Sequence, residues 1–392
     1  MDGSLRLRRG RHIGRTVRDR DADPLLLRTD PLPAAGSVGG MPESSPLRVA
    51  LAGYGLAGAS FHAPLIAATD GLELRAVVTR DPARRDALAA SHPGAVAVDG
   101  LEEVVSDVDV VVVASPNRFH VGLARVGVAA GKHVVVDKPL AVSAAEARAL
   151  AAQAGAAGVV LSAFHNRRWD DDFLTLRRVV GEGRLGRVLR LESRFDRWRP
   201  SIKEGAWREG GDPADGGGLL LDLGSHLVDQ AVVLLGPVVS VYAELGVLRP
   251  SAVVEDDVFV ALRHESGARS HLSAGVFAAD GPPRFRVLGS EGAFVSFGLD
   301  PQEDALRAGA SPLDPGFGLR EPGLAATLND GSGAEPLAME AGRWLAYYDG
   351  LVDAIRGGGA VQAPVSAADA VGVLEVLEAA RESAARGVVV AV

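Results

Sequence analysis

Lys138 is the most informative residue of this chain for chemistry, because lysine is rare in it. Of the 41 basic side chains, only Lys132, Lys138 and Lys203 are lysine. A buried lysine can exchange its proton or polarise a reacting oxygen, whereas a guanidinium group stays charged. The apolar run 134–136 and then Asp137 precede Lys138, and a proline follows it. This pattern predicts a buried parallel strand that presents Asp137 and Lys138 at its carboxyl end, where open α/β sheets bind ligands. The alternative is a surface lysine beside a turn.

Asp222 and His226 form a second candidate group. They are four residues apart, so a helix would place them on one face. An imidazole can take a hydroxyl proton, the Lys138 ammonium group can stabilise an alkoxide, and the Asp222 carboxylate can orient the substrate or the imidazole. Together they suit redox chemistry between an alcohol and a carbonyl. The alternative is that Asp222 caps a helix and His226 packs in its core. A metal site that includes Asp229 would lack a third ligand at metal spacing, so no metal is expected.

A glycine-rich turn follows the first predicted strand, 47–52, and precedes a predicted helix through Ile66. Gly53, Gly55 and Gly58 have the spacing G-x-G-x-x-G. Gly53 would permit the tight turn, Gly55 would let the backbone approach a pyrophosphate, and Gly58 would let the helix pack closely on the strand. Because the motif lies between a strand and a helix, it predicts a dinucleotide site.

The end of the second predicted strand, 74–78, indicates which dinucleotide binds. An NAD site would have an acidic residue in the place of Thr79 to bind the adenosine ribose 2′-hydroxyl. Here Thr79 is followed by Arg80, with Arg84 one helical turn further on, which suits a 2′-phosphate. We therefore predict NADP, and NAD is the alternative if Arg80 only stacks on adenine. Asp81 is expected to cap a helix that begins at Pro82.

Two more predicted strands, 108–114 and 159–164, end in polar residues at the same sheet edge. The first is followed by Ser115, Asn117 and His120, which are candidates for cofactor contacts. The alternatives are a Pro-Asn turn at Asn117 and a helix start at His120. The second strand is followed by a polar segment that begins at His165.

The pattern changes after residue 170. A predicted helix, 171–181, is followed by strands in which apolar and polar residues alternate, at 188–195, 238–247, 257–264, 269–277, 284–288 and 293–297. Such alternation is typical of an antiparallel sheet with one covered and one open face.

Composition limits the classes of function. The chain of 392 residues is long enough for two domains. Its net charge of -9, without basic clusters interleaved with aromatic residues, argues against a nucleic acid partner. No apolar run reaches the roughly 18 residues of a membrane span, so no membrane partner is expected. The absence of cysteine excludes thiolate catalysis and suits a reducing compartment, which favours a cytoplasmic location.

The first 46 residues differ from the rest, because they mix arginine with aspartate and lack apolar periodicity. This composition predicts a disordered tail at 1–46. It fits neither a secretory signal nor a mitochondrial transit peptide.

Over about 47–392, the motifs occur in the order seen in the Gfo/Idh/MocA oxidoreductase family, which the chain resembles. They are the glycine turn, Ser-Pro-Asn-x-x-His at 115–120, Asp137-Lys138-Pro139 and Asp222-x-x-x-His226. The chain is most similar to the branch that contains NADP-dependent scyllo-inositol dehydrogenases, through the strings FHAPL at 61–65, FHNRRWD at 164–170 and GLDPQE at 298–303.

The resemblance implies an α/β fold with an N-terminal Rossmann domain at 47–165. It further implies a C-terminal α/β domain at 166–392 with an open mixed, largely antiparallel sheet, used for homodimer or homotetramer contacts. Lys138, Asp222 and His226 match the family's catalytic residues, and Asp137 replaces the usual glutamate. Either Arg167 or Arg168 matches its substrate-side arginine, and Asn166, Trp198 and Arg199 are further pocket candidates.

The function that we predict from these motifs is NADP-dependent interconversion of a secondary alcohol of a cyclic polyol or sugar with its ketone. The alternatives are an aldose or sugar-lactone type dehydrogenase of the same fold and a cofactor-sensing regulator without catalysis.

Overall fold

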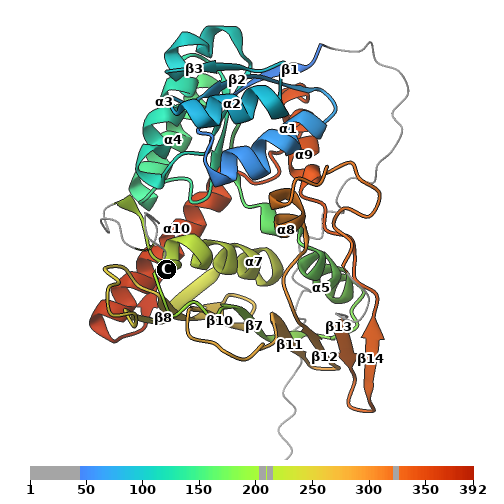
Figure 1. Cartoon of the computed structure of the whole chain (residues 1–392). Coiled ribbons are helices and arrows are strands. Elements are labelled where there is room, and N and C mark those ends of the chain that lie inside the picture. Colours follow the sequence, from blue (N-terminus) through green and yellow to red (C-terminus); the bar gives the residue numbers. More distant parts are fainter. Residues whose placement is uncertain (1–44, 203–208, 210–214, 321–325) are drawn as a thin grey trace, which may run out of the picture. The chain divides into compact units, whose positions relative to one another are not determined.

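The computed structural model describes residues 45–202, 209, 215–320 and 326–392. Residues 1–44 of the predicted tail lie outside the described residues. The described elements form two sheets with helices packed on them (Figure 1). Within this part of the chain, no helix is long and apolar enough to cross a membrane.

The first sheet has six strands in the order β3-β2-β1-β4-β5-β6, and all neighbouring pairs are parallel. Its strands are β1 (Leu47–Ala52), β2 (Leu72–Val78), β3 (Val96–Val98), β4 (Val110–Val113), β5 (His133–Asp137) and β6 (Leu161–Phe164). The strand order reverses between β1 and β4, and doubly wound sheets bind dinucleotides at the carboxyl ends beside such a point. The predicted Rossmann fold is confirmed.

Valine builds the centre of this sheet. Every residue of β4 and residues 134–136 of β5 are valines with 0% exposure. β-Branched residues suit strands that helices cover on both faces. The helices of this part are α1 (Ala63–Ala68), α2 (Pro82–Ser91), α3 (His120–Ala129) and α4 (Ala144–Ala157). As predicted, the Asp81 carboxylate caps α2, accepting hydrogen bonds from the N–H groups of Ala83 and Arg84.

The second sheet has nine strands in the order β14-β13-β12-β11-β7-β10-β9-β8-β15. They are β7 (Val188–Asp196), β8 (Val238–Gly246), β9 (Asp257–His264), β10 (Arg269–Gly275), β11 (Phe285–Gly289), β12 (Ala293–Ser296), β13 (Ala326–Asn329), β14 (Ala334–Leu337) and β15 (Val390–Ala391). Only the β7–β10 pair is parallel among these described strands. The predicted open mixed sheet is therefore confirmed.

Helices cover one face of the second sheet (Figure 1). α7 (Ser225–Leu235) contacts β7 and β10, and α5 (Asp171–Gly181) packs Phe173 against Phe285 of β11. The side chains on this face are buried, whereas alternate residues of β7, β9 and β10 on the other face are partly exposed. The second sheet thus has the covered and open faces that the alternating pattern predicts.

The C-terminal helices contact both sheets. α10 (Ala367–Arg386) packs on α4 of the first part and on β8 of the second, and α9 (Leu345–Arg356) packs on α1. The Ser162 hydroxyl of β6 donates a hydrogen bond to the Val365 carbonyl at 2.8 Å. Segments after residue 166 thus help to bury the first sheet, and the boundary at 165/166 remains a prediction.

Candidate active site

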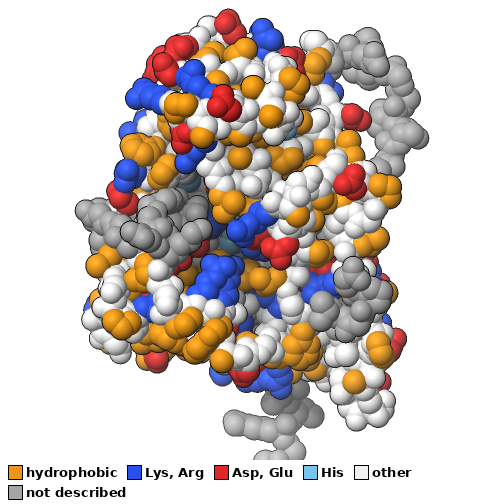
Figure 2. All heavy atoms as spheres, viewed as in Figure 1, with side chains coloured by type: hydrophobic (Ala, Val, Ile, Leu, Met, Phe, Trp, Pro, Cys, Tyr) orange, Lys and Arg blue, Asp and Glu red, His pale blue; other side chains and the backbone are white. Residues whose placement is uncertain are grey.

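A cavity of about 600 Å³ lies beyond the carboxyl ends of β5 and β6. Its other walls come from the segment after β7, from the start of α7 and from α8 (Gln302–Arg307). Figure 2 shows Lys and Arg side chains gathered round a hollow in this face of the molecule. Lys138, Asp222 and His226 all line the cavity, so the structure brings the three predicted catalytic residues together.

Lys138 stands where β5 ends. Its Nζ donates hydrogen bonds to the Asp222 carbonyl at 2.5 Å and to Asp222 Oδ1 at 2.7 Å. The Lys138 side chain is only 11% exposed, so water screens this ion pair little. The backbone N–H of Lys138 donates to Asp137 Oδ1 at 2.8 Å. The lysine is therefore fixed at both ends, and two of its three ammonium donors are used.

Asp222 lies on a π-helical turn, η7 (Leu220–Gly224), rather than on the regular helix that its spacing to His226 predicts. α7 begins directly after this turn and carries His226. A π-helical turn widens the helix by one residue, and such turns are frequent at functional sites. Both side chains reach the cavity, and the Asp222 carboxylate bonds Lys138.

His226 is buried, with 4% exposure. Burial, together with the positive charges of Lys138 and Arg167, lowers the pKa of His226 well below its usual value. The imidazole is therefore neutral at pH 7 and able to accept a proton. Its Nδ1 has no hydrogen-bond partner among the described residues, and the ring of His165 approaches that of His226 edge-on, with centroids 6.1 Å apart.

The structure distinguishes the two candidate arginines. Arg167 and Asn166 lie on the 3₁₀ turn η5 (Asn166–Trp169) and line the cavity. Arg168 points elsewhere, donating to Asp229 Oδ1 at 2.7 Å and to Asp369 Oδ2 at 3.3 Å. Arg168 therefore ties η5 to α7 and α10, and of the two arginines only Arg167 lines the cavity.

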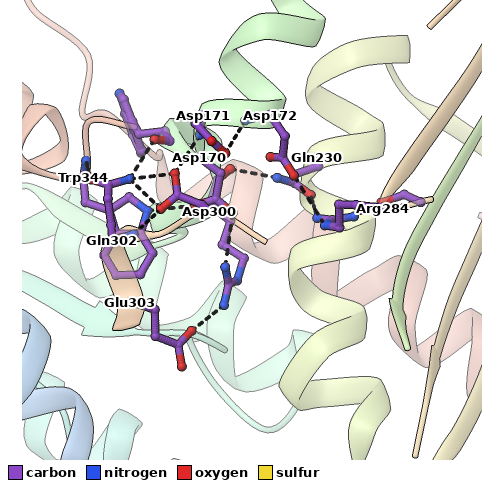
Figure 3. Close-up of polar contacts among 12 residues, drawn as sticks. Asp170, Asp171, Asp172, Gln230, Arg284, Asp300, Gln302, Glu303 and Trp344 are labelled. Carbon is purple, nitrogen blue, oxygen red and sulfur yellow. Dashed lines mark hydrogen bonds and ion pairs between the residues drawn. The ribbon is translucent and has the colours of Figure 1, made fainter. Parts of the chain in front are cut away.

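Arg167 rests on a buried network of carboxylates (Figure 3). Its guanidinium donates to Asp170 Oδ2 at 3.1 Å, and the other oxygen of Asp170 accepts from Trp344 Nε1 at 2.8 Å. Asp300 accepts from the backbone N–H of Asp171 at 2.7 Å. Burial raises the pKa of Asp170, and it raises that of Asp300 well above the usual value.

Glu303 bonds the same arginine from the cavity side, with its Oε2 2.7 Å from Arg167 Nη2. Burial lowers the pKa of Arg167, but the charges of Asp170 and Glu303 raise it more, to above its ordinary value. Arg167 is therefore charged, with one face on the network and the other toward the cavity.

The glycine turn fits the phosphates of a dinucleotide. Gly53 has φ of +110°, which only glycine adopts readily, and a Cβ on Gly58 would lie 2.1 Å from the Gly53 carbonyl oxygen. A Cβ on Gly55 would meet nothing within 4 Å, so the backbone there borders open space that a pyrophosphate can occupy. The following helix starts with a π-helical turn, η1 (Gly58–His62).

Thr79 and Arg80 stand at the end of β2, as predicted. The buried Thr79 donates its N–H to the Val98 carbonyl at 3.0 Å, and exposed Arg80 donates its Nε to the Asp99 carbonyl at 3.1 Å. Arg84 pairs with Asp81 at 3.3 Å instead. The contact of Arg80 with a 2′-phosphate remains a prediction.

Ser115, Asn117 and His120 follow β4, but they do not line the 600 Å³ cavity. His120 is buried, with its ring nitrogens 2.8 Å from the carbonyl oxygens of Ser115 and Pro139. Asn117 Nδ2 donates to the Gly216 carbonyl at 2.9 Å. These two side chains thus hold together the loops that follow β4 and β5 and the segment at Gly216. Their contact with a cofactor remains a prediction.

Several cavity residues escape sequence reasoning. They are Arg197, Glu209, Arg249, Glu303, Arg307 and Trp344. Arg199 lines the cavity as expected, whereas Trp198 lies outside the lining and packs edge-to-face on Phe277 with ring centroids 6.1 Å apart. The alternation Arg-x-Arg after a strand is the signal that could have predicted Arg197.

Models of two protein-family domains match this chain. Residues 47–165 match the oxidoreductase family with an NAD-binding Rossmann fold, and residues 173–295 match the GFO/IDH/MocA C-terminal domain.

Curated relatives cover most of the chain. An uncharacterized oxidoreductase of Escherichia coli, YdgJ, is 41% identical over 87% of this chain and 97% of its own length. The scyllo-inositol 2-dehydrogenase (NADP(+)) IolW of Bacillus subtilis is 34% identical over 86% of this chain and 93% of its own length. A solved structure from gentamicin A biosynthesis, in complex with NAD, matches with a TM-score of 0.71 and 29% identity, covering 90% of this chain and 98% of that one.

The two family domains that match this chain and the curated relatives indicate the same family. The chain belongs to the Gfo/Idh/MocA family of oxidoreductases, and its first sheet is an NAD(P)-binding Rossmann domain.

Proposed function

We propose that this oxidoreductase interconverts a secondary alcohol of a cyclic polyol or sugar with its ketone, using NADP. The observation that carries the proposal is the Lys138–Asp222 pair beside neutral His226, in one cavity at the carboxyl edge of the NAD(P)-binding sheet. The similarity to a scyllo-inositol dehydrogenase supports a polyol or sugar substrate.

The three residues would share the proton and charge of the reaction. A bound nicotinamide supplies the hydride acceptor or donor. The third ammonium donor of Lys138 bonds the substrate hydroxyl and stabilises its developing negative charge. His226 accepts the hydroxyl proton, and Asp222 holds Lys138 in the orientation that the substrate oxygen requires. In the reverse direction, His226 returns the proton to the new alkoxide.

The lowered pKa of His226 agrees with a base that is neutral before the reaction. The charges of Lys138 and Arg167 keep the ring neutral before the reaction, and they favour onward release of the proton once the ring has taken it from the substrate hydroxyl. Asn166, Arg167 and Glu303 offer amide, guanidinium and carboxylate groups for the other hydroxyls of the ring.

NADP is the cofactor that the strand end at Thr79 and Arg80 favours, and IolW is named as NADP-dependent. NAD remains the alternative, because a structural relative was solved in complex with it. We expect Arg80→Ala to weaken NADPH binding by about tenfold and NADH binding by less than about twofold, since a guanidinium–phosphate contact is charge-assisted. Titration of both cofactors into this variant and into the exposed-residue control Arg75→Ala measures this. Equal losses for both cofactors would support stacking on adenine instead.

The test of the function is turnover of purified protein with NADP and NAD across myo-inositol, scyllo-inositol, glucose and xylose, followed by nicotinamide absorbance. We expect oxidation of at least one cyclic polyol or sugar, with NADP preferred. Binding of NADPH without turnover of any polyol, sugar or sugar derivative would contradict the enzymatic proposal and favour a cofactor-sensing regulator.

A further inference from the structure

We propose that the substrate carries an anionic substituent, a carboxylate or a phosphate, which Arg197 and Arg199 bind beside the reaction centre. The inference rests on the proposed function and narrows its substrate class from any polyol or sugar to a negatively charged one.

The backbone holds both arginines toward the cavity. They continue from β7 in an extended segment, with the Arg197 N–H donating to the Gly275 carbonyl at 2.9 Å and the Arg199 N–H to the Val276 carbonyl at 2.8 Å. Alternate residues of an extended segment point to the same side. Both arginines accordingly line the cavity. Trp198, between them, is not part of the cavity lining and packs edge-to-face on Phe277.

The other cations of the cavity wall have carboxylate partners. Lys138 lies 2.7 Å from Asp222, and Arg167 lies 2.7 Å from Glu303. Arg249 lies 2.8 Å from a carboxylate oxygen of Glu209 and 2.8 Å from one of Asp256.

Arg307 shares Glu303 with Arg167, at 3.5 Å. Within the described residues, by contrast, the side chains of Arg197 and Arg199 form no ion pair and no hydrogen bond. Neither guanidinium group is therefore in direct contact with a described carboxylate, although the charges of Asp222 and Glu303 act on Arg197 from a greater distance.

Arg197 is also close to the catalytic group. Burial, and then the charge of Arg199, lower the pKa of Arg197, while the carboxylate of Asp222 acts in the opposite direction. Arg197, Asp222 and Lys138 line the same cavity of about 600 Å³, so one sugar-sized molecule in it can contact all three.

An anion would complement this wall better than a neutral ring. Two neighbouring guanidinium groups repel each other, and a carboxylate or phosphate between them removes the repulsion and forms bidentate, charge-assisted hydrogen bonds. A neutral hydroxyl would leave both charges in a partly desolvated wall without compensation. The site should therefore select against the uncharged analogue of its substrate.

The experiment compares matched substrates that differ in one charged group. These are glucose with glucuronate and glucose 6-phosphate, and myo-inositol with myo-inositol 1-phosphate, each with NADP. The readout is the ratio of kcat/KM for the charged substrate to that for its neutral partner. Arg197→Gln and Arg199→Gln remove the charges but keep amide donors, and Arg125→Gln on the exposed face of α3 is the matched control.

We expect the ratio to exceed about 10 in the unmodified protein and to fall by about 20-fold or more in Arg197→Gln, the size expected for hydrogen bonds between charged groups. Arg125→Gln should leave the ratio unchanged. Preference for glucuronate identifies a carboxylate, and preference for a phosphorylated sugar identifies a phosphate. A ratio near or below 1 in the unmodified protein would overturn the inference and leave the proposed function standing.

Binding separates the two proposals if no compound is turned over. Inorganic phosphate and glucuronate are titrated calorimetrically into the NADPH-bound protein and into the Arg197→Gln protein. Saturable binding that Arg197→Gln abolishes would support the anion site even where the proposed reaction fails. Absent binding, or binding that Arg197→Gln leaves unchanged, would overturn it.

Discussion

At the residue scale, the chemistry depends on how Lys138 shares its donors. Two of the three ammonium hydrogens bond Asp222, so the side chain is held in one rotamer and one hydrogen remains for a substrate oxygen. The Asp222 carboxylate offsets the ammonium charge, while His226 stays neutral in the same cavity. The site therefore contains a fixed donor beside a base, which are the two groups that alcohol oxidation requires.

Lys138→Ala tests this arrangement. We expect turnover to fall by about 100-fold or more, because no other described ammonium group reaches this point of the cavity, while NADPH affinity changes by less than about threefold. Steady-state kinetics and cofactor titration measure the two quantities. Lys132→Ala is the matched control, since half-buried Lys132 lies outside the cavity lining and donates to the Ser106 carbonyl at 3.1 Å. Unchanged turnover in Lys138→Ala would remove Lys138 from the mechanism.

Residue type and spacing predicted much of this cavity, but not which neighbour faces it. The rarity of lysine indicated Lys138, and the family strings indicated Asn166 and one of the two arginines that follow it. Arg167 and Arg168 could not be separated, because their directions on a 3₁₀ turn are set by partners distant in sequence. Arg168 forms an ion pair with Asp229, whereas Arg167 forms one with Glu303. Such long-range pairing leaves no local pattern.

At the element scale, the glycine turn must both pack closely against the protein and leave space for a ligand, and different glycines meet these two requirements. Gly58 is needed for packing, because a Cβ there would lie 2.1 Å from the Gly53 carbonyl oxygen. Gly55 is needed for access, because a Cβ there would meet no protein atom within 4 Å and would project into the space for the pyrophosphate.

The two alanine variants should therefore fail differently. Gly55→Ala should keep its thermal midpoint within about 2 °C and weaken NADPH binding by about tenfold or more, because the methyl group occupies ligand space. Gly58→Ala should lower the midpoint by several degrees, because the turn or the helix must shift. Thermal melts with and without NADPH separate the two effects. Equal melts for both variants without cofactor would contradict the division of roles.

The buried network around α5 predicts a pH-dependent contribution to stability. Burial raises the pKa of Asp172 to about 7, outweighing the attraction of Arg284, whose Nε lies 3.8 Å from Asp172 Oδ2. Between the unfolded pKa of about 4 and the folded pKa, the native state binds more protons than the unfolded state. The contribution of Asp172 to the free energy of unfolding therefore falls as pH rises from 4 to 7.

Asp172→Asn should remove this contribution. We expect the difference in free energy of unfolding, unmodified protein minus variant, to be smaller at pH 7.5 than at pH 5. The lowered pKa values of buried histidines such as His226 and His165 make the free energy of unfolding rise with pH. This effect is the same in both proteins, so it cancels in the difference. Urea unfolding at both pH values measures it, and Asp86→Asn, at an exposed position of α2, is the control. A difference independent of pH would contradict the raised pKa.

Helices and strands could be predicted where the hydrophobic pattern repeats over several residues. Very short strands and irregular helical turns could not be predicted. The valine-rich strands and the alternating strands of the second sheet have strong patterns, and the structure confirms them. β13, β14 and β15 are only four, four and two residues long, too short for a periodic pattern. The π-helical turns η1 and η7 also went unpredicted, because they depend on backbone hydrogen bonds rather than on residue spacing.

At the scale of the whole molecule, the open face of the second sheet is the candidate surface for self-association. Tyr242, Phe259 and His271 lie on this face at half-buried positions of β8, β9 and β10. Trp198 and Phe277, 59% and 40% exposed, extend the same face beyond β7 and β10. Large aromatic residues on a sheet without a covering helix are typical of an association surface.

A charged row crosses this open face. Glu192 of β7 lies 2.9 Å from Arg190 and 3.0 Å from Arg286 of the neighbouring strand. The carboxylate thus offsets part of the positive charge of this row. We propose that a second copy of this chain occupies it, giving the homodimer or homotetramer that the family resemblance implies.

Phe259→Arg tests self-association, because it would place a charge from each copy in the apolar part of the proposed interface. We expect the unmodified protein to show at least twice the 40.5 kDa mass of the chain by light scattering at micromolar concentration. The variant should show the single-chain mass with unchanged circular dichroism, since an unpaired buried charge is costly. Leu313→Arg, at a position 66% exposed and outside the second sheet, should leave the mass unchanged. A single-chain mass for the unmodified protein would contradict the proposed assembly, and it would mean that the aromatic residues of the open face serve another partner.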